Sequence, residues 1–148
     1  MLKWIDLPPV WLALFAAGAW ALQPHLPGPE LGPRADWIGG VFILAGIVLA
    51  GLAVIQMRRH RTTIIPHQTP SALVTTGVFR LSRNPIYLAD AILLGGWILI
   101  LGQPVALILI PFFALLIERR FIVPEEARLS AKFVAEFAAY TQQTNRWL

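Results

Sequence analysis

The segment of residues 37–57 is the feature that most constrains the fold, because it holds 21 residues without a single charge. As a helix it would be about 31 Å long, which matches a hydrocarbon core of about 30 Å. The composition agrees, with 57% hydrophobic and 14% charged residues and a mean hydropathy of +0.65. So little polar surface cannot cover a soluble globule of 148 residues. The chain is therefore predicted to be an integral membrane protein.

Three other apolar segments, residues 7–22, 86–101 and 104–117, are predicted to be further membrane-spanning helices. The first has prolines only at its start, where a missing N–H costs nothing. Its alternative interpretation is a cleaved signal peptide, although Asp6 follows Lys3 and no small-residue cleavage site precedes Gln23. Gly102-Gln103 joins the last two segments so tightly that they must be antiparallel neighbours. We expect an all-α membrane protein with about four transmembrane helices, forming one domain over residues 1–148.

The basic residues are distributed very unequally between the two sides of this arrangement. Eleven of the twelve fall on one side, and only Arg34 falls on the other. This bias predicts a multi-pass protein of the cytoplasmic (inner) membrane with both termini in the cytoplasm. The net charge of +4 is then mainly a topology signal, and the basic stretches lack the interleaved aromatic residues that bind nucleic acid.

The sequence gives no indication of a disulfide or a metal centre. It contains no cysteine, which excludes disulfides and thiolate ligands. Its histidines, His25, His60 and His67, lack the i, i+3 or i, i+4 spacing of a helical metal site. We therefore expect no bound metal.

Two cytoplasmic parts are predicted, residues 58–85 and residues 118–148. In the second, Pro124 suits the first turn of a helix, and Glu125 and Glu126 would lie beside the positive end of its dipole. Apolar residues then recur at spacings of 4, 4 and 3, namely Leu129, Phe133, Phe137 and Tyr140. This pattern predicts one amphipathic C-terminal helix that lies on the membrane surface or covers the loop.

An ordered set of motifs surrounds the predicted hairpin. The run Arg83-Asn84-Pro85-Ile86-Tyr87-Leu88 precedes it, and Glu125-Glu126 and Arg146-Trp147 follow it. This set resembles the signature of the isoprenylcysteine carboxyl methyltransferase family and the related phospholipid methyltransferases. Thr62-Thr63, Pro66 and residues 73–77 also resemble bacterial members, so that the resemblance covers about residues 62–148.

The motif departs from the family pattern at three positions. Asn84 stands where histidine is frequent, Ala89 where glycine is found, and Val78 where proline is usual. Asparagine can donate and accept hydrogen bonds but cannot titrate, so it cannot act as a proton shuttle. Methyl transfer to a carboxylate needs no such shuttle.

The resemblance implies S-adenosylmethionine as the methyl donor, bound between the loop, the start of the third span and the tail. It implies the catalytic residues Arg83, Asn84, Tyr87 and Glu126. The cofactor-binding residues that it implies are Val74, Thr75, Gly77, Arg80, Arg83, Asn84, Pro85, Tyr87, Leu88, Glu125 and Glu126.

The chemistry of these residue types is compatible with that role. Asn84 as N-cap and Pro85 as first helical residue would leave free N–H groups near Arg80 and Arg83, where a carboxylate can bind. The alternative is structural, with the arginines as membrane-interface anchors and the glutamates as complements of a helix dipole. Asp90 lies three residues after Tyr87, on the same helical face. It either lines the cofactor pocket or an acceptor tunnel, or pairs with an arginine.

The favoured function is methyl transfer to a lipophilic acceptor at the cytoplasmic membrane face, with carboxyl O-methylation of an isoprenylcysteine-like substrate preferred. The alternatives are N-methylation of a phospholipid amine, an NADPH-dependent enzyme like the sterol reductases, and a non-catalytic membrane subunit. The expected partners are the lipid bilayer and the acceptor. We expect this acceptor to enter laterally from the membrane near Tyr87, Asp90 and Trp97, beside Gly95-Gly96.

The predicted topology can be tested with single cysteines in this cysteine-free chain. Cysteines introduced at Thr63, Ser130 and Gly28 should differ in labelling by an impermeant maleimide in intact cells, with only Gly28→Cys accessible from outside. Outside labelling at position 63 together with protection at position 28 would contradict the orientation.

Overall fold

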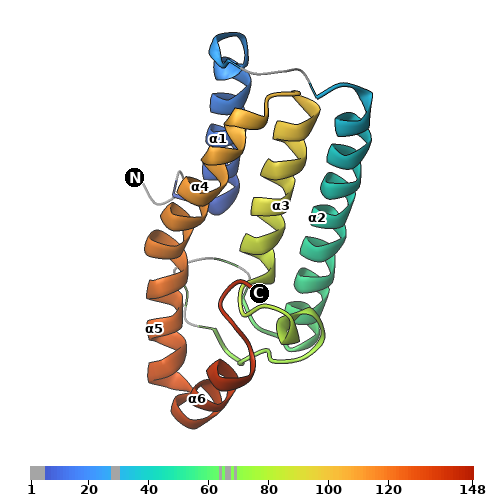
Figure 1. The fold of residues 1–148 in the computed structure, drawn as a ribbon. Helices are drawn as coiled ribbons and strands as arrows, with labels where there is room; N and C mark the ends of the chain where they lie inside the picture. Colours follow the sequence, from blue (N-terminus) through green and yellow to red (C-terminus); the bar gives the residue numbers. More distant parts are fainter. Residues whose placement is uncertain (1–5, 28–30, 64, 66–67, 69) are drawn as a thin grey trace.

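The computed structural model describes residues 6–27, 31–63, 65, 68 and 70–148. Lys3, Gly28, Pro66 and His67 lie outside the described residues. Across those described, the chain is all-helical and forms no strand, as the sequence predicted. The four apolar helical segments stand side by side and run alternately up and down (Figure 1).

Four long segments make the up-and-down arrangement. They are α1 (Pro8–Leu22), α2 (Pro33–Arg59), α3 (Pro85–Ile100) and α4 (Leu109–Ile117), the last preceded by the 3₁₀ helix η4 (Pro104–Ile108). A second 3₁₀ helix, η2 (Gln23–His25), follows α1. The tight turn between α3 and η4 is confirmed, and Gly102 permits it by adopting a φ of 71°, which other residues rarely tolerate.

α2 is the element with the clearest membrane character. It is the one described helix that is long and apolar enough, by length and composition, to cross a membrane. Its 27 residues span about 40 Å, and large apolar side chains such as Trp37 and Leu44 are 80% and 62% exposed. α3 is apolar but shorter. Four membrane crossings therefore stay a prediction.

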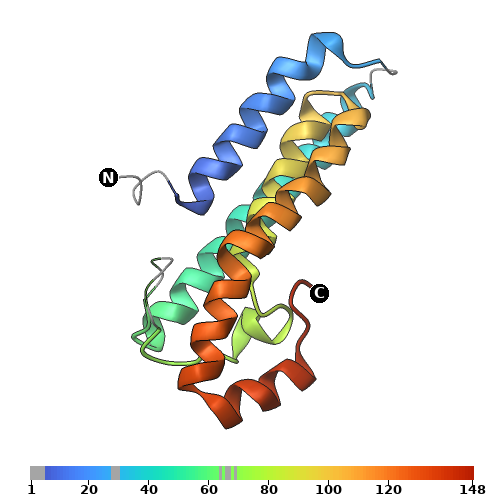
Figure 2. The same ribbon diagram turned by 90° about the vertical axis from the view of Figure 1, so that its left-hand side faces the viewer.

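α4 ends at Ile117, where the predicted fourth span ends, but the chain stays helical beyond that residue. The helix continues through a π-helical segment, η5 (Glu118–Ile122), into α5 (Val123–Lys132). α4, η5 and α5 therefore form one continuous rod, called here the α4–α5 rod (Figure 2). Pro124 lies in the first turn of α5, as predicted, and Glu125 and Glu126 follow it in the same turn. Proline lacks an N–H and would clash with the carbonyl four residues earlier in an α-helix. The wider π-helical segment η5 contains that earlier residue, Arg120.

The prediction of one amphipathic helix in the tail was wrong, because the helix is interrupted at Phe133. Its φ of −120° and ψ of 57° separate α5 from α6 (Val134–Gln143). The predicted apolar face nevertheless packs as one cluster, since Leu129 and Phe133 contact the core formed by Phe137 and Tyr140 with residues of α2 and the loop. Burial raises the pKa of the Tyr140 hydroxyl, which donates to the carbonyl of Phe79.

α2 and α3 approach each other through glycines. A Cβ built on Gly39 would lie 2.6 Å from the carbonyl oxygen of Gly96, and one built on Gly96 would lie 2.7 Å from that of Gly39. Gly46 faces Leu93 in the same way, at 2.7 Å. Small residues allow such backbone contact between apolar helices. This contact sets where α3, and the motif at its start, lies relative to α2.

The contact predicts opposite outcomes for two adjacent glycines. Gly39→Ala forces a methyl group against the backbone of α3, and such overpacking costs about 1–3 kcal/mol. Gly40→Ala meets nothing within 4 Å and gains helix propensity, up to about 1 kcal/mol. Thermal unfolding in detergent should show a lower Tm for the first variant and an equal or higher Tm for the second. Equal Tm values would contradict the close contact.

Candidate functional site

The C-terminal residues lie across the start of α3. The amide N–H of Arg83 donates to the carbonyl of Asn145 at 3.0 Å. The Ser82 hydroxyl and the Asn84 side-chain amide both donate to the carbonyl of Arg146, at 3.2 and 3.0 Å. Asn84 is therefore the N-cap residue by position, as predicted, but its side chain makes no capping bond and instead holds the tail.

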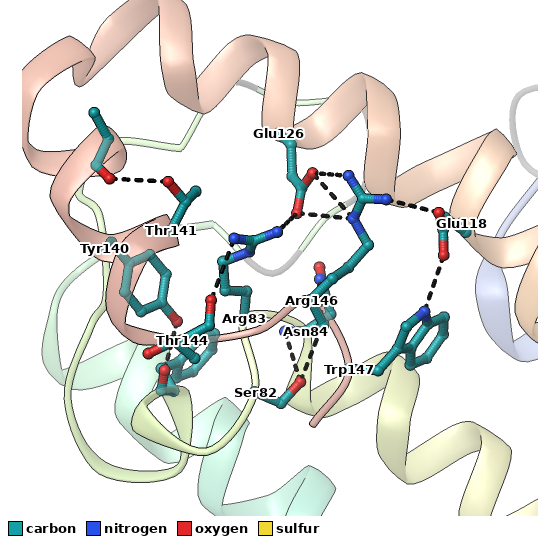
Figure 3. Close-up of polar contacts among 12 residues, drawn as sticks. Ser82, Arg83, Asn84, Glu118, Glu126, Tyr140, Thr141, Thr144, Arg146 and Trp147 are labelled. Carbon is teal, nitrogen blue, oxygen red and sulfur yellow. Dashed lines mark hydrogen bonds and ion pairs between the residues drawn. The ribbon is translucent and has the colours of Figure 1, made fainter.

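A cluster of charged side chains joins the tail, the residues just before α3 and the α4–α5 rod (Figure 3). Glu126 accepts from Arg83 at 3.1 Å and from Arg146 at 2.6 Å. Arg146 also reaches Glu118 at 2.7 Å, and Glu118 accepts from the indole of Trp147 at 3.0 Å. The Arg83 and Glu126 side chains are only 13% and 14% exposed, so this pair is shielded from solvent.

The cluster favours the charged forms of Glu118 and Arg146. The indole hydrogen bond from Trp147, together with Arg146, lowers the pKa of Glu118. The hydrogen bonds and charge of Glu126, aided by Glu118, raise the pKa of Arg146. Both groups stay ionised at neutral pH. Since Glu118 has a depressed pKa, its stabilising contribution is present at neutral pH and is lost in acid.

A cavity of about 760 Å³ opens beside this cluster, within the size range of small-molecule sites. Its walls come from the start of α1, the end of α2 and the loop that follows, the start of α3, and α5. The lining residues are Leu7, Pro8, Pro9, Met57, Thr63, Ile65, Gln68, Pro70, Phe79, Arg83, Asn84, Pro85, Ile86, Tyr87, Asp90 and Glu125.

Polar atoms in the cavity wall are only partly satisfied by the protein. The Tyr87 hydroxyl donates to Glu125 at 3.1 Å, linking α3 to α5. The Nε of Arg83 and the Oδ2 of Asp90 are buried and have no hydrogen-bond partner. A carboxylate costs about 2.5–3.5 kcal/mol near the centre of a membrane helix. A buried polar atom without a hydrogen-bond partner therefore needs an explanation, and a bound ligand that supplies the partner is one.

The predicted site residues divide into two groups. Arg83, Asn84, Pro85, Tyr87 and Glu125 line the cavity. The others lie around it, with Val74 buried in the neighbouring apolar cluster, Arg80 exposed and Glu126 in the charge cluster.

Three further predicted residues, Thr75, Gly77 and Leu88, also lie outside the lining. A Cβ on Gly77 would lie 3.1 Å from Gln56 of α2, which places this turn against the helix end. The Gln56 amide also donates to the hydroxyl of Thr76.

Other residues near the site were not anticipated. Leu7, Pro8 and Pro9 of the N-terminal region form one wall, although no local pattern distinguishes them from any helix start. Lys132 donates to the carbonyl of Pro70 at 2.8 Å and so ties α5 to the loop. Trp97 and Gly95, which were expected beside the acceptor path, do not line this cavity. The Trp97 indole donates to the carbonyl of Ala16, and Gly95 faces Ile110.

Most of the chain matches one known protein family. Residues 35–136 match the phospholipid methyltransferase family. The chain belongs to the phospholipid methyltransferase family. The match runs from the start of α2 to the start of α6, and so includes the α3 motif and Glu125-Glu126. No curated protein and no solved structure matches the chain.

Membership in the phospholipid methyltransferase family makes the protein a membrane methyltransferase. The apolar α2 agrees with this assignment. Within the part of the chain that the structure describes, no group of three or more potential metal-ligating side chains occurs.

The charge cluster predicts that Arg146 holds the C-terminal residues in place. Arg146→Gln should free residues 144–148, because three charge-assisted contacts of about 1.5–3 kcal/mol each are weakened or lost. Hydrogen exchange should then rise at residues 144–148 and at Arg83. Arg59→Gln, the same change at an exposed position on α2, serves as the control. Unchanged exchange in Arg146→Gln would show that the backbone bonds alone hold the tail.

Proposed function

We propose that the protein transfers a methyl group from S-adenosylmethionine to a lipophilic acceptor at the cytoplasmic face of the membrane. The observation that carries this proposal is the cavity at the junction of the apolar helices and the polar segments, with an unpartnered arginine Nε in its wall. The family match supplies the methyltransferase class.

The residues present suit the proposed donor. The open Nε of Arg83 can donate to a carboxylate such as that of the methionine moiety. Glu125 can accept from an amino group or ribose hydroxyls, and Tyr87 offers both an aromatic wall and a hydroxyl. Bound there, the donor supplies an electrophilic methyl group on a sulfonium.

The contribution of the protein to the reaction is mainly positioning. Arg83 is fixed from two sides, by Glu126 at 3.1 Å and by donation to the carbonyl of Thr144 at 3.2 Å. Tyr87 is fixed by Glu125. Preorganised side chains of this kind hold reactants in line and exclude water, which is worth up to about 7–11 kcal/mol in favourable cases.

The location of the cavity supports an acceptor that comes from the bilayer. Its apolar wall is formed by Leu7, Pro8, Pro9 and Ile86, which belong to the ends of the two helices α1 and α3. The group that receives the methyl is then either the carboxylate of an isoprenylcysteine-like molecule or the amine of a phospholipid. With both termini and the loop in the cytoplasm, a soluble donor would arrive from the side of the tail.

The donor is tested by calorimetric titration of the purified protein with S-adenosylhomocysteine and with NADPH. We expect binding of the first only, weakened about ten- to a hundredfold by Glu125→Gln because one charge-assisted contact is lost. Glu136→Gln on α6, an exposed glutamate, should bind like the wild type. Binding of NADPH instead would favour a reductase, and binding of neither would contradict the proposed function.

A further inference from the structure

The start of α1 is held to the α4–α5 rod by three side chains, Asp6, Trp11 and Arg120, called here the α1 clasp. The Arg120 Nε donates to the Asp6 carboxylate, and the Trp11 indole donates to the same carboxylate oxygen at 3.2 Å. The Arg120 guanidinium also lies 5.5 Å from the centre of the Trp11 ring, within the range of a cation–π contact. The proposed donor site uses none of these three residues.

The α1 clasp is joined directly to one wall of the cavity. Asp6 immediately precedes Leu7, Pro8 and Pro9, which line the cavity and are called here the α1 wall. Proline fixes its own φ at about −65° and also restricts the residue before it. The segment between Asp6 and the helix therefore has little freedom to bend, and the position of Asp6 sets the position of the α1 wall.

The other side of the α1 clasp lies on the π-helical segment η5, which also holds the tail. Glu118, two residues before Arg120, accepts from Arg146 at 2.7 Å. Side chains two residues apart on a helix do not face each other, so η5 binds the tail and the start of α1 with different sides. α5 follows η5 directly and carries Glu125 in the cavity wall. The α1 clasp therefore fixes the α1 wall relative to the polar groups of α5.

The rest of α1 is held independently of the α1 clasp. The rings of Phe15 and Phe113 pack edge to face, with centroids 5.3 Å apart. The Trp97 indole donates to the carbonyl of Ala16 at 3.1 Å. The Arg120 side chain, in contrast, is 51% exposed, and exposed ion pairs contribute little to stability. Loss of the α1 clasp should therefore displace the start of α1 and leave the helices folded.

We propose that the α1 clasp positions the acceptor by fixing the wall against which its apolar chain packs, so that Asp6, Trp11 and Arg120 are positioning residues. This inference rests on the proposed function. The α1 wall offers apolar surface, and its two prolines have no N–H to donate. Such a wall suits a hydrocarbon chain and not the charged groups of the donor, which need hydrogen-bond partners. Loss of the α1 clasp should therefore weaken acceptor binding and leave donor binding unchanged.

The position of the α1 wall is tested with a single cysteine in this cysteine-free chain. Pro8 is buried, so Pro8→Cys in detergent should react slowly with a maleimide. Adding Arg120→Gln should speed the reaction about tenfold, because an ion pair and a cation–π contact are lost. Adding Arg119→Gln, the same change at the neighbouring exposed arginine, should leave the rate unchanged. Equal rates in all three proteins would overturn the inference.

The effect on the acceptor is tested with N-acetyl-S-farnesylcysteine and dioleoylphosphatidylethanolamine as probes and a labelled methyl donor. For the probe that the wild type methylates, KM should rise about tenfold in Asp6→Asn and in Arg120→Gln, while kcat changes by less than about twofold. The charge exchange Asp6→Arg with Arg120→Asp should recover part of the loss, which a merely structural role of either residue would not produce. Arg119→Gln should behave like the wild type.

Affinity for S-adenosylhomocysteine distinguishes this inference from the proposed function. In Arg120→Gln it should stay within about twofold of the wild-type value, which also shows that the variant is folded. A parallel loss of this affinity would assign the α1 wall to the donor site and overturn the inference. An unchanged KM in both single variants, or methylation of neither probe by a wild type that binds S-adenosylhomocysteine, would also overturn it. No binding of S-adenosylhomocysteine by the wild type would instead refute the proposed function.

Discussion

The ion pair between Arg83 and Glu126 is the interaction on which the site depends. It connects the start of α3 to the α4–α5 rod, two elements that are separated in sequence by the whole apolar hairpin. Arg146 adds the tail to the same carboxylate. Buried ion pairs contribute little net stability, but removing one partner leaves an uncompensated charge and is costly. The pair therefore specifies one arrangement of the three segments that surround the cavity.

Much of the fold could be predicted from local sequence patterns. The uncharged segment of residues 37–57 gave α2 because length and apolarity need no tertiary information. The prolines at residues 8 and 85 correctly marked helix starts. Pro124 likewise lies in the first turn of α5, although a π-helical segment and not a loop precedes it. The break at Phe133 has no local signal, because no glycine or proline stands there.

The site was predictable where a short motif carries it and unpredictable where distant segments meet. Arg83, Asn84, Pro85, Tyr87 and Glu125 came from the motifs and do line the cavity. The role of the Asn84 amide was not predictable, because its partner is a backbone carbonyl at Arg146, 62 residues away. The wall formed by Leu7, Pro8 and Pro9 depends on how α1 packs, which the sequence pattern does not encode. The family match ends at residue 136, so the tail contacts lie outside it.

The Gly102-Gln103 turn has a geometric consequence for the cavity. α3 and the α4–α5 rod are joined there, and they diverge toward the opposite end, where the cavity lies (Figure 1). The two segments are therefore joined twice, covalently at Gly102-Gln103 and by the ion pair of Arg83 with Glu126 near the opposite end. Glu126, held by both Arg83 and Arg146, thus limits how far α5 can lie from the start of α3, the two elements that carry Glu125 and Tyr87 in the cavity wall.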